Sequence, residues 1–478
     1  MKTHITLVNP PYPGQSFPHP PFPPLGLGYV AAVLEQNKFN IDVVDCLTYN
    51  LSYDGFREEI SKRKPDIVGV TCNTLTYKSA LQILKVAKEA LPNCITVIGG
   101  HHVTFEDEQA FKDLPTLDAV IRNEGEYTML ELAQRVEAGK DWHDVIGTTV
   151  RKAEGSVVRN PKRAHIENLD ELPFPARHLW PLEATSKYGR IMFDIIASRG
   201  CSYWCDFCIE VRMHGQKFRK RSVQNVCDEL EECKKTYGAT WFSFVDAAFT
   251  VDQQFTADLC DEIIRRNINI NWVAGTRVDM VTKELLQKMA QAGCKSMWYG
   301  VESGAQNVLN EMRKGITLEQ TIKAFQWTVE AGMKPDPNVV LGFPGETKES
   351  AWATIKLCQK IAPTYMASYT IATPYPGTPL YYLVKEKGWL KDTNFDHYDT
   401  ATPTFETPTM TIQELRKLRA KAWSSFYERP SYIRAMFKKS FIYGLAAMKA
   451  AVTFRFIDLR MALQPNKIPP KPPSKSHF

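Results

Sequence analysis

The 478-residue chain is long enough for two or three domains, and its 44% hydrophobic and 23% charged content predicts folded cores. The net charge of +6 is small for this length, so charge alone does not indicate nucleic-acid binding. No run of about 18 apolar residues occurs, which excludes a membrane-spanning helix. The 11 cysteines and the lack of a signal-peptide pattern predict a reducing, cytoplasmic setting.

Strands and helices alternate through residues 1–145. The predicted strands cover residues 3–9, 41–45, 66–71, 95–98 and 119–121, and the predicted helices cover residues 25–34, 54–63 and 77–90. This alternation predicts a doubly wound parallel sheet, which binds ligands at the carboxyl ends of its strands. The residues of interest at these ends are Thr71, Asn73, Thr74, Gly99 and Gly100. The two glycines allow the backbone to approach a flat ligand closely.

The remaining chain divides into four predicted segments. Residues 146–190 lose the periodicity and contain several prolines, so we expect a linker. From residue 191 the alternation resumes, with predicted strands at residues 191–196, 241–245, 271–274, 296–301, 338–341 and 367–371. Six such units predict an open partial (β/α)6 barrel over residues 191–373. A mostly helical region (374–464) and a disordered Pro/Lys/Ser-rich tail (465–478) are expected to follow.

A group of three cysteines follows the first predicted barrel strand. Cys201, Cys205 and Cys208 have the spacing C-x3-C-x2-C. Three thiolates can hold a [4Fe–4S] cluster and leave one iron open to a substrate-like molecule. Zinc is the alternative, but it needs a fourth ligand, and the nearest histidine, His214, is six residues beyond the last cysteine. We therefore predict one [4Fe–4S] cluster at these cysteines.

Other short stretches add to this signal through their order along the chain. They are Asn9-Pro10-Pro11, Pro65–Thr71, Val97–Thr104, Glu124-Gly125-Glu126, Leu169–Pro175, Tyr299–Gly304 and Gly342–Thr347. Each of them is weak alone, but together with the cysteines they extend over nearly the whole chain. In this combination the chain resembles the cobalamin-binding radical S-adenosylmethionine (SAM) enzymes, and among them the group around the anaerobic magnesium-protoporphyrin monomethyl ester oxidative cyclase.

The resemblance implies three cofactors, namely cobalamin, SAM and the [4Fe–4S] cluster. It implies cobalamin contacts by Thr71, Asn73, Thr74, Gly99, Gly100 and His101. At the barrel, Asp246 would hold the SAM amino group, Arg277 the carboxylate and Glu302 the ribose hydroxyls. The loop with Gly342, Gly345 and Glu346 would support adenine. No residue is assigned to handle substrate protons or radicals.

A histidine ligand to cobalt is not expected. Cobalamin mutases supply one from the motif Asp-x-His-x-x-Gly. This chain has Asp141-Trp-His143-Asp-Val-Ile-Gly147, which contains one residue too many and lies at the end of the first domain. We interpret it as a surface helix start.

The implied activity is modification of an unactivated carbon of a hydrophobic small molecule through a 5′-deoxyadenosyl radical. C-methylation and oxidative cyclisation are both open. We expect an electron donor of the flavodoxin or ferredoxin type and no nucleic acid as partner. One alternative is a corrinoid and iron–sulfur electron-transfer or carrier protein. Another is a methylthiotransferase acting on RNA, although its second trio of N-terminal cysteines has no counterpart here.

Residues 432–463 form a basic amphipathic stretch. Such a stretch can lie on a membrane surface, which would give a peripheral contact at the inner membrane, or cover a hydrophobic cleft. The alternative is a helical pair packed on the barrel.

Overall fold

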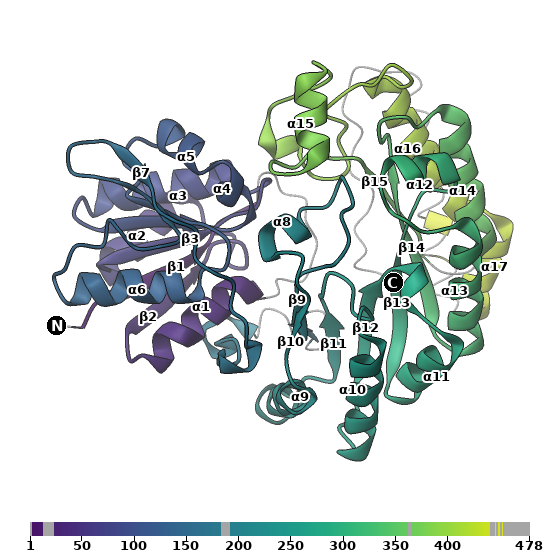
Figure 1. The fold of residues 1–478 in the computed structure, drawn as a ribbon, viewed down its shortest axis with the longest axis horizontal. Coiled ribbons are helices and arrows are strands. Elements are labelled where there is room, and N and C mark those ends of the chain that lie inside the picture. The colour runs from purple at the N-terminus through teal and green to yellow at the C-terminus, as the bar shows by residue number, and fades with distance from the viewer. Residues whose placement is uncertain are drawn as a thin grey trace.

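The computed structural model describes residues 2–12, 23–182, 192–361 and 366–439, and in addition residues 445, 448, 449 and 452. It contains two α/β units that lie side by side, an N-terminal unit in purple and blue and a larger unit in teal and green (Figure 1). Each unit is built around its own sheet. The architecture confirms the predicted fold class, a doubly wound domain followed by a partial barrel and a helical C-terminal region.

The N-terminal sheet has the strand order β2-β1-β3-β4-β5-β6-β7. Its strands are β1 (His4–Asn9), β2 (Asn40–Asp45), β3 (Ile67–Thr71), β4 (Ile95–Gly99), β5 (Ala119–Ile121), β6 (Thr148–Arg151) and β7 (Val157–Arg159). The first five run parallel. Because β2 and β3 lie on opposite sides of β1, the strand order reverses there. A reversal of this kind opens a ligand crevice at the carboxyl ends of the strands.

Helices pack on this sheet through apolar faces. They are α1 (Leu25–Gln36), α2 (Tyr53–Arg63), α3 (Tyr77–Ala90), α4 (His101–Phe105), α5 (Asp107–Asp113) and α6 (Glu126–Glu137). In α3, the buried residues Ala80, Ile83, Leu84 and Ala87 have the spacing of one helix face. This periodicity explains why the helix prediction for residues 77–90 matches the structure.

Strands β6 and β7 form an antiparallel hairpin beyond β5. They lie within residues 146–190, where we predicted a linker. Thr148, Thr149 and Val150 are buried beside β5, whose side would otherwise be an open sheet edge. Up to Leu182, where the described part of this segment ends, the remaining elements are two short 3-10 turns, η1 (Leu169–Glu171) and η2 (Arg177–Leu179).

The second sheet has six parallel strands in the order β15-β14-β13-β12-β11-β8, as expected for a partial barrel. The strands are β8 (Met192–Ile195), β11 (Trp241–Phe244), β12 (Asn271–Thr276), β13 (Cys294–Glu302), β14 (Lys334–Leu341) and β15 (Ser368–Ile371). The helices between them are α9 (Val223–Tyr237), α10 (Gln253–Arg265), α11 (Lys283–Gln291), α12 (Gln306–Glu311), α13 (Leu318–Glu330) and α14 (Lys348–Ile361), with the 3-10 turn η3 (Val278–Met280) after β12. The main core lies between these strands and helices.

Strand β14 begins at Lys334, four residues before the predicted start. The additional part of the strand contains Pro335 and Pro337, which lack an N–H for a sheet ladder. In the structure β15 pairs with β14 only from Asn338 onward. The prolines are therefore tolerated, since β14 has no β15 partner at their level.

The cysteines lie on a loop closed at its base by two short strands. Strands β9 (Ser198–Arg199) and β10 (Arg219–Lys220) pair antiparallel, and α8 (Glu210–His214) lies between them. Gly200 enters the loop with φ +88°, and a Cβ there would come 2.4 Å from the carbonyl oxygen of Lys217. Only glycine fits this turn into the cysteine motif.

The C-terminal region contacts both units. Its elements are α15 (Pro379–Glu386), η4 (Phe395–His397), α16 (Ile412–Tyr427) and α17 (Pro430–Lys439). Arg419 Nε donates to the carbonyl of Tyr369 in β15 at 3.0 Å. The Phe395 ring lies 4.5 Å from that of His102 in the N-terminal unit. The region thus bridges the barrel and the N-terminal sheet.

Most of the predicted amphipathic stretch 432–463, and the whole tail 465–478, fall outside the described residues. Among the helices that are described, none combines the length and the apolar character needed to cross a membrane.

Candidate active site

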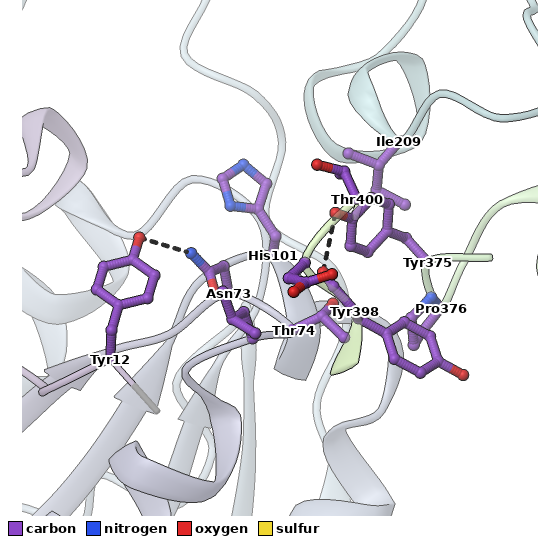
Figure 2. Close-up of a pocket in the computed structure, with 11 residues that line it drawn as sticks. Tyr12, Asn73, Thr74, His101, Ile209, Tyr375, Pro376, Tyr398 and Thr400 are labelled. Carbon is purple, nitrogen blue, oxygen red and sulfur yellow. Dashed lines mark hydrogen bonds between the residues drawn. The ribbon is translucent and has the colours of Figure 1, made fainter. Parts of the chain in front are cut away.

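A cavity of about 390 Å³ lies between the N-terminal unit, the cysteine loop and the C-terminal region (Figure 2). Its lining residues are Tyr12, Asn73, Thr74, Leu75, His101, Ile209, Tyr375, Pro376, Tyr398, Asp399 and Thr400. Asn73 and His101 follow β3 and β4, so the cavity opens at the carboxyl ends of these strands. Ile209 directly follows Cys208. The cavity therefore joins the predicted cobalamin edge to the predicted cluster loop.

Asn73 and Thr74 are held in a fixed turn after β3. The backbone N–H of Asn73 donates to Thr76 Oγ1, and the backbone N–H of Thr76 donates to Asn73 Oδ1, both at 3.0 Å. Asn73 Nδ2 lies 3.5 Å from the Tyr12 hydroxyl, as Figure 2 shows. Thr74 Oγ1 lies 3.3 Å from Nδ1 of His102. These bonds hold the turn at the wall of the cavity.

Thr71, Gly99 and Gly100 lie behind this wall and do not line the cavity. Thr71 and Gly99 are paired in the register of β3 and β4. Gly100 has φ +116°, and a Cβ there would come 2.1 Å from the carbonyl oxygen of Cys72. Gly100 is thus required by the close contact of the two strand ends, and it leads the chain to His101. Cofactor contacts of these residues stay predictions.

The three predicted cluster ligands share the loop between β9 and β10. Cys205 is buried, and Cys201 and Cys208 are partly exposed. The backbone N–H of Cys208 donates to the carbonyl of Cys205 at 3.2 Å, and that of Cys201 donates to Gly215 at 3.3 Å. Burial raises the pKa of Cys208 to about 12. Three thiols are a donor set suited to an iron–sulfur cluster.

No three His, Cys, Asp or Glu side chains of the described segments come together as ligands of a single metal ion would. In a cubane cluster each protein thiolate binds a different iron. Such thiolates do not need to meet at one point.

Arg277 extends from the end of β12 toward the cysteines. Its Nη1 lies 3.9 Å from Cys205 Sγ, and its guanidinium lies 3.7 Å from the centre of the Tyr203 ring. Its Nε and Nη2 donate to the two carboxylate oxygens of Asp279, each at 2.9 Å. We predicted that the Arg277 guanidinium would bind the SAM carboxylate through two nitrogens, but its Nε and Nη2 are held by Asp279. Its Nη1 is directed at the cysteine loop.

Glu302 ends β13 in an unusual backbone conformation. Its φ is +58°, and the pairing of β13 with β14 shifts register at this point. Its carboxylate accepts a bond from Lys314 Nζ at 2.7 Å, and both residues are 6% exposed. Gly300 makes room for the pair, because a Cβ there would come 2.5 Å from Glu302 Oε1. A buried, non-glycine residue in the left-handed region stores backbone strain, which is concentrated at functional sites.

Lys314 is a site residue that the sequence did not reveal. Burial alone would lower the pKa of its ammonium group, but the charges of Glu302 and Cys205 raise it above the usual value. The ammonium also lies 5.9 Å from the centre of the Phe207 ring, within the cysteine loop. Lys314 therefore brings a buried positive charge to the cluster side of the barrel.

Asp246 follows β11 and is buried. Its carboxylate accepts bonds from the hydroxyl of Ser198 and from the backbone N–H of Ala197, the latter at 3.3 Å. Burial raises its pKa to about 6, although these bonds act in the opposite direction. Asp246 thus holds the chain where it leaves β8 toward the cysteine loop. The predicted contact with the SAM amino group stays a prediction.

The loop after β14 is built on its glycines and one buried carboxyl group. Gly342 and Gly345 have φ of +83° and +86°. The backbone N–H of Gly342 donates to Glu346 Oε2 at 2.5 Å, while Glu346 Oε1 is buried and has no hydrogen-bond partner. Burial raises the pKa of Glu346 to about 8. Glu346 therefore supports the loop that we predicted to hold adenine.

His143 lies away from the cavity, but the helix start that we predicted there is wrong, because residues 141–147 form loop and turns that lead into β6. Its ring stacks on Trp142, and its Nδ1 lies 2.5 Å from Asp141 Oδ1. It is not among the residues that line the cavity.

Several lining residues carry no sequence signal. Tyr12, Tyr375 and Tyr398 come from opposite ends of the chain, in stretches without periodicity. Ile209 could have been found, because it follows the last cysteine of the motif.

A half barrel that carries a three-cysteine loop after its first strand, beside a doubly wound domain, defines a radical SAM enzyme with a second cofactor-binding unit. Models of known families agree with this class. The B12 binding domain matches residues 19–133, and the radical SAM superfamily matches residues 195–358.

Related proteins match over most of this chain. An uncharacterized methyltransferase of Pyrococcus horikoshii is 34% identical over 411 residues, which are 86% of this chain and 89% of that protein. The anaerobic magnesium-protoporphyrin IX monomethyl ester cyclase of Rubrivivax gelatinosus is 30% identical, with coverage of 92% and 81%. The chain belongs to the B12-binding radical SAM enzymes.

A solved structure shows the same fold. OxsB, a cobalamin-dependent SAM radical enzyme solved with aqua-cobalamin and SAM bound, superposes with a TM-score of 0.75 at 19% identity. The superposition covers 98% of this chain and 74% of OxsB. Together these matches confirm the predicted resemblance, enzyme class and cofactor set, and they set aside the electron-transfer or carrier alternative.

Proposed function

We propose that this enzyme modifies an unactivated carbon of a hydrophobic small molecule, by C-methylation or by oxidative cyclisation. The observation that carries the proposal is the shared cavity. Asn73 and His101 of the B12-binding unit and Ile209 beside Cys208 of the barrel line the same space. A substrate in that space lies against both cofactor-binding units.

Each predicted residue has a role in this proposal. Cys201, Cys205 and Cys208 hold the cluster. SAM is bound by Asp246, Arg277, Glu302, Gly342, Gly345 and Glu346, and cobalamin by Thr71, Asn73, Thr74, Gly99, Gly100 and His101. When bound, SAM with the cluster supplies a 5′-deoxyadenosyl radical, and cobalamin supplies a methyl group or accepts an electron.

The protein's own residues prepare the cluster side of the site. Burial raises the pKa of Cys205, and the positive charges of Lys314 and Arg277 act in the opposite direction. Tyr203 lies under the Arg277 guanidinium, and the Phe207 ring packs edge-on to Phe343 at 6.5 Å. These aromatic rings exclude water from the loop, which strengthens the electrostatic interactions inside it.

The concave face of the barrel favours an apolar substrate. Successive side chains of a strand point to opposite faces, and the Tyr299 hydroxyl contacts Thr328 of the outer helix α13 at 2.8 Å. Trp298 therefore faces inward, where it is 37% exposed. Val245, beyond the end of β11, is 42% exposed. Exposed large apolar side chains in a concave site favour an apolar ligand.

Methyl transfer and cyclisation both stay in the proposal. The relative at 34% identity is named a methyltransferase, and the relative at 30% identity is a cyclase. An electron donor of the flavodoxin or ferredoxin type, and a peripheral membrane contact through residues 432–463, are further parts of the proposal.

The experiment is anaerobic reconstitution followed by mass spectrometry. The loaded enzyme is incubated with SAM, a reductant and a lipid and pigment extract. We expect 5′-deoxyadenosine together with a substrate ion shifted by one methylene unit, for methylation, or by loss of hydrogen, for cyclisation. The Cys205→Ala variant is the control and should form neither. A fully loaded wild-type enzyme that releases no 5′-deoxyadenosine would contradict the proposal.

A further inference from the structure

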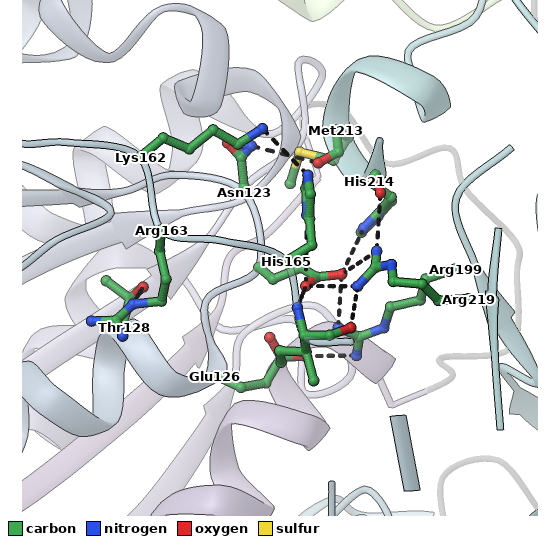
Figure 3. Close-up of polar contacts among 12 residues, drawn as sticks. Asn123, Glu126, Thr128, Lys162, Arg163, His165, Arg199, Met213, His214 and Arg219 are labelled. Atoms are coloured by element: carbon green, nitrogen blue, oxygen red, sulfur yellow. Dashed lines mark hydrogen bonds and ion pairs between the residues drawn. The ribbon is translucent and has the colours of Figure 1, made fainter. Parts of the chain in front are cut away.

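A buried carboxylate of the N-terminal unit binds both ends of the cysteine loop. Glu124 follows β5, and its side chain is 4% exposed. Arg219 donates to it from two nitrogens, Nη2 to Oε1 at 2.8 Å and Nη1 to Oε2 at 3.1 Å. Arg199 Nη1 lies 3.4 Å from Oε1. Figure 3 shows the two arginines side by side, together with His165 and His214.

The positions of these arginines in the chain give the contact its significance. Arg199 and Arg219 are paired with each other in the register of β9 and β10. They form the base of the loop that contains all three cysteines, and Arg199 stands two residues before Cys201. A group that holds both arginines holds the whole loop at its base.

Neighbouring contacts extend this junction to helix α8, which begins two residues after Cys208. His214 Nδ1 lies 3.5 Å from Glu124 Oε1. Asn123 Nδ2 lies 3.5 Å from the carbonyl oxygen of Met213, to which it donates. Arg199 is also bound by Glu126, which accepts from Nη2 at 2.7 Å. The N-terminal unit thus contacts the loop on both sides of the cysteines.

The Glu124 carboxylate is ionised in this setting. Burial alone would raise its pKa, but the nearby His165 and His214 rings, the bonds from Arg219 and the charge of Arg199 lower it well below the usual range. It also accepts the backbone N–H of Ile166 at 2.8 Å. Removing one partner of a buried ion pair of this kind strongly destabilises the folded protein, because the other charges stay buried without compensation.

We propose that Glu124 is a positioning residue that fixes the cysteine loop against the B12-binding unit and so sets the distance between the cluster and the corrin. The inference rests on the proposed function, because it takes the three cysteines as cluster ligands. Glu124 is not among the residues that line the cavity, and it contacts the cysteine loop through Arg199, Arg219 and His214. Its loss should leave each cofactor bound but loosen their relative placement.

Electron paramagnetic resonance of the full-length enzyme tests this placement. Cob(II)alamin and the reduced cluster are both paramagnetic, and the cluster accelerates the relaxation of the cob(II)alamin spin by an amount that falls steeply with distance. We expect Glu124→Gln to lose most of this acceleration while iron and corrinoid contents stay at wild-type levels. The control is Glu131→Gln, whose carboxylate pairs with Arg135 and Arg163 but with no residue of the cysteine loop. In Glu131→Gln the cob(II)alamin spin should relax as fast as in the wild type.

A second variant covers the case in which Glu124→Gln does not fold. Glu124→Asp keeps the charge but cannot reach both arginines and Ile166, so it too should lose acceleration. If a Glu124 variant that carries both cofactors shows the wild-type relaxation of the cob(II)alamin spin, the inference is overturned. Loss of both cofactors in both variants would also overturn it, since it would show a purely structural role. A wild-type enzyme that binds no cluster or no corrinoid would instead refute the proposed function.

Discussion

The two units of the molecule prepare for their cofactors in different ways. In the half barrel the predicted SAM residues are charged, buried and already engaged: Asp246 with Ser198, Arg277 with Asp279 and Glu302 with Lys314. In the N-terminal unit the predicted residues are uncharged apart from His101, whose pKa burial lowers, and they lie at strand ends and on the turns that follow them. SAM has a charged amino acid moiety, which suits pre-arranged charges.

The largest difference between the two units is expected when the cysteines are replaced. Replacing Cys201, Cys205 and Cys208 by alanine should remove essentially all cluster iron and sulfide, because no other cysteines of the chain have cluster spacing. Corrinoid uptake should persist, since the N-terminal unit has its own core. Iron, sulfide and cobalt analysis of the reconstituted protein measures both. Four irons per chain in the triple variant would show that the ligands lie elsewhere.

The next largest effect is expected at the Glu302–Lys314 pair. Glu302→Gln should weaken SAM binding by roughly 1.5–3 kcal/mol, the value of a charge-assisted hydrogen bond. It should also destabilise the fold by about 3–5 kcal/mol, because Lys314 is left buried without a partner. Calorimetric titration with SAM and thermal unfolding measure these effects.

A double variant separates the two roles of Glu302. Glu302→Gln/Lys314→Met should recover most of the stability and none of the SAM affinity. If the double variant recovers both, Glu302 serves the fold and does not contact SAM.

Glu346 offers a pH test of the same half barrel. Its pKa is raised from 4.5 to about 8 by burial, so the folded state binds the proton more tightly than the unfolded state. The stabilisation is full below pH 4.5 and is lost as the pH rises to about 8, at up to about 1.4 kcal/mol for each unit of the shift. Relative to Glu346→Gln, the wild type should lose thermal stability from pH 5 to pH 8. A difference between the two melting temperatures that does not change with pH would exclude a buried neutral carboxyl group.

The N-terminal unit should respond to a change of backbone shape. Gly100→Ala combines a strained φ, which costs about 1–3 kcal/mol, with a clash against Cys72. We expect lower hydroxocobalamin uptake and an earlier unfolding transition. Gly139→Ala is the matched control: Gly139 also has a positive φ, +64°, but nothing lies within 4 Å of its Cβ position, so it should lose only about 1–2 kcal/mol. Equal effects of both variants would show that the contact with Cys72 is unimportant.

Local sequence patterns were enough to locate the parallel strands of both sheets. Strand β3 was predicted at residues 66–71 and lies at Ile67–Thr71, because a short apolar run between helical patterns is a local signal. The cysteine spacing is local as well, and it identified the cluster loop. The short hairpin β6–β7 was missed, because its strands are brief and partly polar.

The ion pairs could not be predicted, because they depend on how distant segments meet. Glu124 and Arg219 are 95 residues apart, and no periodicity links them. Lys314 is 12 residues from Glu302, but a helix separates them. Sequence placed Glu302 at a strand end, whereas only the structure shows that its carboxylate is already held.

The cavity also bears on how the protein is made. Its walls come from Tyr12, near the start of the chain, from Ile209 in the middle and from Tyr398 near the end. At about 5–20 residues per second, a ribosome needs roughly 20–80 s to reach Tyr398. Until then the N-terminal unit can fold, but the wall that closes over its sheet edge does not exist. Cobalamin captured during synthesis would meet an open platform, and its enclosure would be among the last events of assembly.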